Sequence, residues 1–208
     1  MVAPSRSRSF GLVRAAAVLV LIGASSVALA ACASTPTPAA KPSVAPSEKP
    51  TASAAPAAIP TATPTPVSLT CSQLITADQI YAFNPNFGTD PGYSPKAGSL
   101  AAKVASYKGL TCAWLNQTSG DVIEVAVARP PAGDLTSLKN AAVTNSQSVP
   151  TYGVPPQVDE AYFAMRGSAG EVQVFRGSYW ITAFSTAFAE PGDPAPLIQN
   201  VLDNLPKG

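Results

Sequence analysis

Apolar and polar residues divide this chain of 208 residues into three stretches. A run from Ala15 to Leu29 is apolar except for two serines, and it is shorter than the roughly 20 residues that a membrane-spanning helix needs. Residues 33–67 are almost entirely Ala, Pro, Thr and Ser. Over residues 68–208 apolar residues recur with the periods of helices and strands, so we expect a single folded domain there.

Strand-like patterns dominate that domain. The segments with this pattern are residues 110–116, 121–129, 160–166, 171–176 and 179–186. Short glycine-bearing turns join the last three, which is typical of antiparallel hairpins. The last segment is apolar or small on both faces, which predicts a central position in the sheet.

Helical patterns lie before, between and after these strands. A capping box over Thr76–Gln79 predicts the start of one helix, Ser94-Pro95 of a second and Asp134 of a third. The final helix has the clearest apolar face, made by Leu197, Ile198, Val201, Leu202 and Leu205. We therefore predict an α+β fold, with a five-stranded antiparallel sheet and helices packed mainly on one face.

The first stretch has the features of an export signal. Three arginines precede the apolar run and small residues end it, as in secretory signal peptides. The run ends in Leu29-Ala30-Ala31-Cys32, which resembles the bacterial lipobox. The resemblance implies cleavage before Cys32, with diacylglycerol on its thiol and an acyl chain such as palmitate on its amine. Residues 1–31 would then be a lipoprotein signal peptide, and the protein would be anchored to the outer face of the cell membrane. The alternative is an ordinary signal peptide with a chance cysteine.

Residues 32–67 are expected to be a lipidated cysteine followed by a disordered linker. Nine prolines favour extended polyproline II, and too few large apolar residues are present to form a core. We interpret the linker as a stalk that holds the domain away from the membrane. Its Thr-Pro repeats also resemble O-glycosylated stalks of secreted proteins.

The amino-acid composition argues against several classes of function. The predicted domain has eight Lys and Arg against eleven Asp and Glu, without a basic cluster, which argues against a nucleic-acid partner. The chain has no histidine, so the usual hydrolase triads are excluded and a metal site is disfavoured. It has no Gly-x-Ser-x-Gly, Ser-x-x-Lys or phosphate-loop motif. We expect no cofactor, no metal and no catalysis.

Two cysteines lie in the predicted domain. With Cys32 assigned to lipid, Cys71 and Cys112 remain, and two cysteines in an exported domain most simply pair. Their spacing lacks the Cys-x-x-Cys form of redox motifs, and the lack of histidine disfavours a metal pair. We therefore predict a disulfide that ties the start of the domain to its body.

Three segments resemble a known group of proteins. They are Cys-Ser-Gln-Leu-Ile-Thr at residues 71–76, Gly-Leu-Thr-Cys-Ala-Trp at 109–114 and Val-Asp-Glu-Ala-Tyr-Phe at 158–163. They are similar to uncharacterised cell-envelope lipoproteins of actinobacteria, whose domain carries Cys-x-Leu-Leu-Thr, Cys-x-Trp and Gly-Asp-x-Ala segments. Val158 stands where a glycine is usual, and Ile75 replaces a leucine. The resemblance supports the disulfide and the α+β fold, and it brings no catalytic residues.

Aromatic residues provide the candidate binding site. Because strand side chains alternate, Trp180, Thr182 and Phe184 share the face opposite Ile181, which we expect under the final helix. An uncovered apolar face can mark a binding site, and we expect the loop over residues 84–98 to roof it in part. The alternative is that another segment covers this face. The predicted docking face comprises Trp180, Phe184, Thr182, Phe87 and Tyr93.

Three functions follow from these features. The first is a binding or sensing module for a small apolar ligand or an envelope protein. The second is an envelope enzyme that uses carboxylate or Ser/Lys chemistry, and the third is a passive accessory subunit of a membrane complex. A ligand pocket near Trp180 would favour the first, clustered buried carboxylates the second and a flat exposed patch the third.

Overall fold

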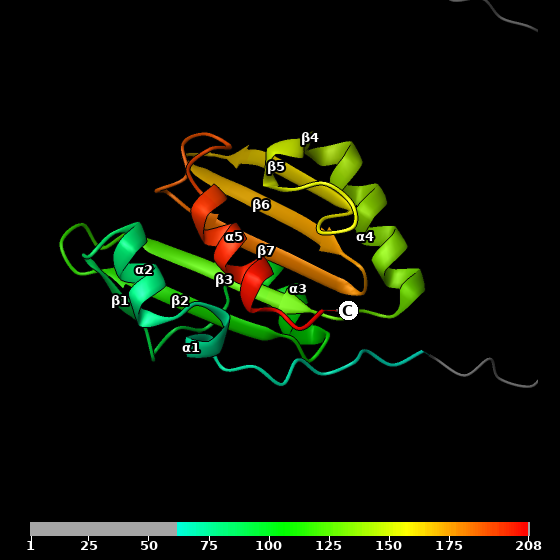
Figure 1. The fold of residues 1–208 in the computed structure, drawn as a ribbon, viewed down its shortest axis with the longest axis horizontal. Helices are drawn as coiled ribbons and strands as arrows, with labels where there is room; N and C mark the ends of the chain where they lie inside the picture. Colours follow the sequence, from blue (N-terminus) through cyan, green and yellow to red (C-terminus); the bar gives the residue numbers. More distant parts are fainter. Residues whose placement is uncertain (1–61, 208) are drawn as a thin grey trace, which may run out of the picture. The chain divides into compact units, whose positions relative to one another are not determined.

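One seven-stranded antiparallel sheet forms the centre of the domain (Figure 1). The computed structural model describes residues 62–207. The strands are β1 (Phe87–Thr89), β2 (Leu110–Asn116), β3 (Val122–Ala128), β4 (Gln147–Ser148), β5 (Glu160–Arg166), β6 (Ala169–Arg176) and β7 (Tyr179–Ser185). Their order across the sheet is β1-β2-β3-β7-β6-β5-β4, so β7 is central as predicted.

The predicted count of five strands is wrong, although the α+β class is correct. The two additional strands are the edges: β1 pairs with β2 over three residues, and β4 pairs with β5 over two. Segments of two or three residues are too short to show the alternation of apolar and polar residues that identifies a strand. They are strands because the neighbouring strand supplies their hydrogen-bond partners.

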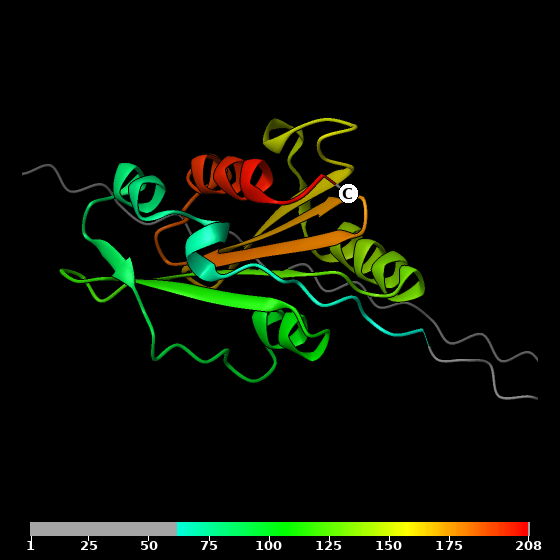
Figure 2. The ribbon, with the colours of Figure 1, turned by 60° about the horizontal axis from the view of Figure 1, so that its bottom comes forward.

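Helices cover both faces of the sheet, which corrects the prediction that they pack mainly on one (Figure 2). The helices are α1 (Cys71–Leu74), α2 (Ala77–Phe83), α3 (Leu100–Ser106), α4 (Ala132–Asn145), the 3-10 helix η1 (Pro150–Tyr152) and α5 (Ala195–Asn204). Figure 2 shows α1, α2 and α5 on one side of the sheet and α3 and α4 on the other. We call these the α5 face and the α3 face.

Each face of the sheet has its own core. On the α5 face, residues such as Val125 and Ile181 are fully buried against Leu197 and Val201 of α5. On the α3 face, the buried cluster is smaller and contains Ala101, Val104, Ala126, Ala128, Leu138, Ala142, Tyr162, Phe175 and Trp180. Two of its four helical residues, Ala101 and Ala142, are alanines, which weakens the amphipathic signal of α3 and α4.

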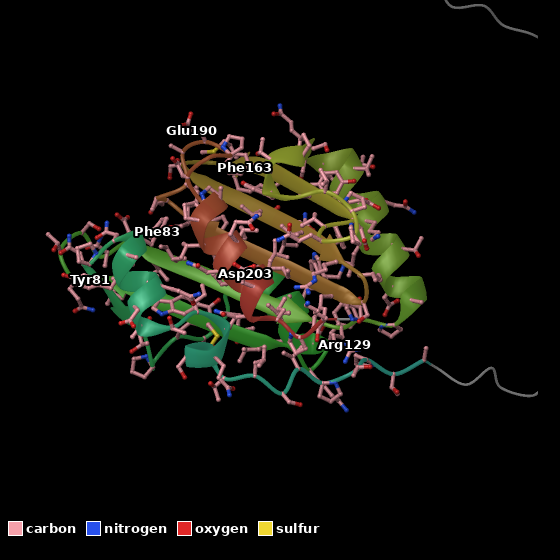
Figure 3. The ribbon with its side chains drawn as sticks, viewed as in Figure 1. Tyr81, Phe83, Arg129, Phe163, Glu190 and Asp203 are labelled. Atoms are coloured by element: carbon pink, nitrogen blue, oxygen red, sulfur yellow. A yellow bond between two sulfur atoms is a disulfide. The ribbon has the colours of Figure 1, made fainter. Side chains whose placement is uncertain are left out.

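The predicted disulfide is present. Cys71 and Cys112 are bonded with their Cα atoms 5.5 Å apart, and the bond ties α1 to β2 (yellow bond, Figure 3). Cys112 and Trp114 follow the strand period and are both buried in the core of the α5 face. The bridge thus fixes the beginning of the domain to the body of the sheet.

Side-chain caps begin three of the five described α-helices, α1, α2 and α3. The Thr76–Gln79 capping box is present, and a second box, which the sequence analysis missed, joins Thr70 to Gln73 ahead of α1. Two predicted starts are wrong. Ser99, rather than Ser94-Pro95, caps α3, and α4 begins after Pro131, with Asp134 in its first turn.

The chain joins the domain at one end of the sheet. The amide of Thr65 donates to the carbonyl of Arg129, directly after β3, with an N–O distance of 3.0 Å. Figure 3 shows Arg129 beside this incoming segment. The predicted signal peptide, Cys32 and most of the linker lie outside the described residues. Within residues 62–207, no helix has the length and apolar character needed to cross a membrane.

Candidate ligand cavity

Trp180 is a core residue, so the predicted uncovered face is wrong at this position. Its side chain is 0 % exposed, beneath α3 and α4. Its ring Nε1 donates to Gln173 Oε1 at 3.2 Å, and its ring meets Tyr107 edge-on at 6.4 Å between centroids. The bond to Gln173 satisfies the indole N–H inside the core, so Trp180 is unavailable to a ligand.

The same face opens further along β7. Thr182 and the partly buried Phe184 line a cavity of about 350 Å³, which lies between the sheet, the loop before α3 and the first residues of α3. Its lining comprises Lys96, Ala97, Gly98, Ser99, Leu100, Ala101, Glu124, Arg166, Glu171, Thr182, Ala183 and Phe184. The volume is in the range of small-molecule sites, and the end of the predicted roofing loop forms one wall.

The two aromatic residues assigned to the loop lie on opposite faces of the sheet. Phe87 is in β1 and packs in the core of the α5 face, next to Phe83, so it does not belong to the site. Tyr93 lies near Glu124, which points to the α3 face. The Tyr93 hydroxyl is buried and has no hydrogen-bond partner among the described residues. Burial, and then the charge of Glu124, raise the pKa of this phenol well above its usual value, so Tyr93 is neutral.

Two carboxylates stand on either side of Phe184. Strand register places Glu124 of β3 and Glu171 of β6 directly opposite Phe184 of β7, so the three side chains form a row on one face. Neither carboxylate was predicted from the sequence to be a site residue. A signal was available for Glu124, because it is the one charge on a face of small and apolar residues in its strand.

Glu171 has a cation of its own. Its Oε1 accepts from Arg166 Nε at 3.1 Å and from Nη2 at 3.0 Å, and its side chain is 15 % exposed. Arg166 Nη2 also donates to the backbone carbonyl of Asn145 at 3.1 Å, which ties the ion pair to the end of α4. This charge pair is therefore neutral overall and held in place.

Glu124 has no such partner. Within residues 62–207, no lysine or arginine nitrogen lies within ion-pairing distance of its carboxylate. Burial raises the pKa of Glu124, and the nearby Tyr93 hydroxyl partly offsets this rise. A negative charge at Glu124 is thus desolvated, and among the groups near it the neutral Tyr93 hydroxyl offsets this only in part.

The cavity combines an apolar floor with charged groups at its margin. Phe184 and Leu100 offer apolar surface, whereas Glu124 and Lys96 offer single charges. The described part of the chain has no cluster of three or more side chains that could hold a metal ion. Such an arrangement suits a small amphipathic molecule better than an ion.

Comparison of the chain with family models, with curated proteins and with solved structures found no match. The similarity to actinobacterial envelope lipoproteins therefore remains a prediction from the three short segments.

Proposed function

We propose that this protein is an extracytoplasmic binding module, held at the cell membrane by lipidated Cys32, that takes a small amphipathic ligand into the cavity beside Phe184. The observation that carries the proposal is the cavity itself. It lies on the strand face that the sequence analysis selected, although at Phe184 rather than at Trp180. Small-molecule sites are concave, mostly apolar and fitted with a few polar groups, and this cavity has each of these properties.

The position of the cavity is compatible with a tether. The incoming chain contacts Arg129 at the end of β3, next to the start of β7, whereas Phe184 is near the end of β7. From Tyr179 to Phe184 the strand extends about 17 Å, at roughly 3.4 Å per residue. A domain anchored through residues 62–69 can therefore present the cavity away from its attachment.

The proposal is tested with 2-phenylethanol, an uncharged probe with one aromatic ring. Binding is followed by ligand-observed NMR, with Phe184→Ala as the variant and Tyr81→Ala as its control. Tyr81 is also aromatic, but it is 67 % exposed on α2, which lies on the α5 face. We expect Phe184→Ala to weaken binding at least fivefold and Tyr81→Ala to leave it unchanged. Absence of binding to the wild type, or equal binding by Phe184→Ala, would refute the cavity as a ligand site.

An envelope enzyme is the second candidate, because two carboxylates line one cavity. Glu124 and Glu171 lie on strands separated by β7, so their backbones are about 10 Å apart, or two strand spacings. However, Arg166 already occupies Oε1 of Glu171, which favours binding over proton transfer. Hydrolysis of 4-nitrophenyl glycosides or esters that is lost in both Glu124→Gln and Glu171→Gln would favour the enzyme.

A further inference from the structure

The two carboxylates beside Phe184 differ in one respect that indicates the charge of the ligand. Both face the same cavity, and both are opposite Phe184 in the sheet. Arg166 neutralises Glu171 at 3.0 Å, whereas no cation lies within ion-pairing distance of Glu124 in the described part of the chain. Glu171 is therefore paired with a positive charge, whereas Glu124 lines the cavity without one.

We infer that the cavity binds an amphipathic cation, whose ammonium or amidinium group pairs with Glu124 while its apolar body lies on Phe184 and Leu100. This inference rests on the proposed function of the same cavity. A cation entering beside Glu124 replaces the water that the carboxylate has lost, through a charge-assisted hydrogen bond. The ligand class is therefore an amine with a small aromatic or aliphatic body.

The groups around Glu124 agree with this ligand class. The Tyr93 hydroxyl, buried near the carboxylate, can donate to it and favours its charged form. Lys96 is the remaining free cation among the described lining residues, and its exposed ammonium is a like charge that a cationic ligand must avoid. A desolvated carboxylate at one end and apolar surface at the other would exclude carboxylate ligands by repulsion.

Three probes with nearly the same body test the inference on the full-length protein. They are 2-phenylethylammonium, the uncharged 2-phenylethanol and 3-phenylpropionate, titrated at pH 7 and low salt with detection by ligand-observed NMR. We expect the ammonium to bind about tenfold more tightly than the alcohol, a difference of about 1.4 kcal/mol, and the carboxylate to bind most weakly. Glu124→Gln should remove the preference for the ammonium and leave the affinity for the alcohol within about twofold.

Each result has a defined meaning. Equal affinities of the wild type for ammonium and alcohol would overturn the inference and leave the binding module intact, because the alcohol still reports on the cavity. If no probe binds, both proposals fail. Lys96→Gln provides a second variant that preserves the fold of the buried strands. This variant should bind the ammonium probe as tightly as the wild type or more tightly. A lower affinity would identify Lys96 as a partner of the ligand and would overturn the inference that the ligand is a cation.

Discussion

Trp180 and Phe184 show how one face of one strand is divided between a core and a cavity. Both are aromatic, both are on β7, and both point to the α3 face. Trp180 is fully enclosed between α3 and α4, whereas Phe184 is partly exposed in the wall of the cavity. The two residues differ in which elements cover them, and this cover cannot be predicted from the sequence of β7 alone.

This division gives the first prediction, which compares two truncations. Trp180→Ala leaves a large void and an unpaired Gln173, so it should lower the free energy of unfolding by about 3–5 kcal/mol. Phe184→Ala removes a ring that already contacts solvent, and its cost should be distinctly smaller. Urea unfolding at pH 7 measures both. Equal losses would mean that Phe184 is also a core residue in solution.

Glu124 gives a prediction on pH. Burial raises its pKa in the folded state above its value in the unfolded chain. Its contribution to folding is therefore most favourable below the ordinary glutamate pKa of about 4.3, and it is lost as pH rises through the raised value. Glu124→Gln removes this dependence. The variant should match or exceed the wild type at pH 7, by less than about 1 kcal/mol because Glu124 is partly exposed to solvent.

Urea unfolding of the wild type and Glu124→Gln at pH 7 and pH 4 tests this sign. The advantage of the variant over the wild type should shrink at pH 4. Tyr93, Lys96, Arg166 and Glu171 are the other ionisable groups near Glu124 or its cavity. The wild type and the variant share all four, so the difference between the two proteins reports on Glu124. If the stability advantage of Glu124→Gln over the wild type instead grew toward pH 4, the raised pKa of Glu124 in the folded state would be contradicted.

At the scale of elements, the disulfide fixes α1 to β2. The bond closes a loop with a sequence separation of 41 residues. Loss of such a native bridge typically costs 2–5 kcal/mol. Cys71→Ala combined with Cys112→Ala should therefore lower the free energy of unfolding by about 2–4 kcal/mol, and reduction of the wild type should lower it equally. Mass spectrometry of a non-reduced digest supplies the control, since free thiols at both positions in the exported protein would refute the pairing.

Sequence patterns revealed those elements whose evidence is local. Glycine turns identified the β5–β6–β7 hairpins, and the apolar face of α5 identified the larger core. The edge strands β1 and β4 were missed because two or three residues have no period. Cover of the α3 face was not predicted, because the apolar side of a helix such as α3 or α4 does not indicate which face of the sheet it packs on.

The cavity was predictable only in part. Phe184 and Thr182 followed from the strand period. Glu124, Leu100 and Arg166 come from other elements, and only the strand order brings them to one place. The inward direction of each side chain can be read from a strand, but which helix covers it depends on long-range packing.

At the scale of the whole described domain, the incoming chain and the cavity lie toward opposite ends of the sheet. The described chain reaches the domain at Thr65 and Arg129, where the aromatic ring of Tyr179 lies 5.2 Å from the Arg129 guanidinium. The cavity lies toward the other end of β7, on the α3 face. Tethering and ligand binding should therefore be separable functions.

This separation leads to the last prediction, made for Cys32→Ala in the full-length protein. If Cys32 carries the lipid, the variant should lose labelling by a fatty-acid probe and either leave the membrane fraction or remain as an uncleaved precursor. The released protein should bind 2-phenylethylammonium as tightly as the wild type, because the cavity does not involve the incoming chain. Labelling that persists would remove the anchor, whereas lost affinity in a folded variant would show that the two ends of the domain are coupled. Retained affinity without labelling would establish a binding domain that works independently of its tether.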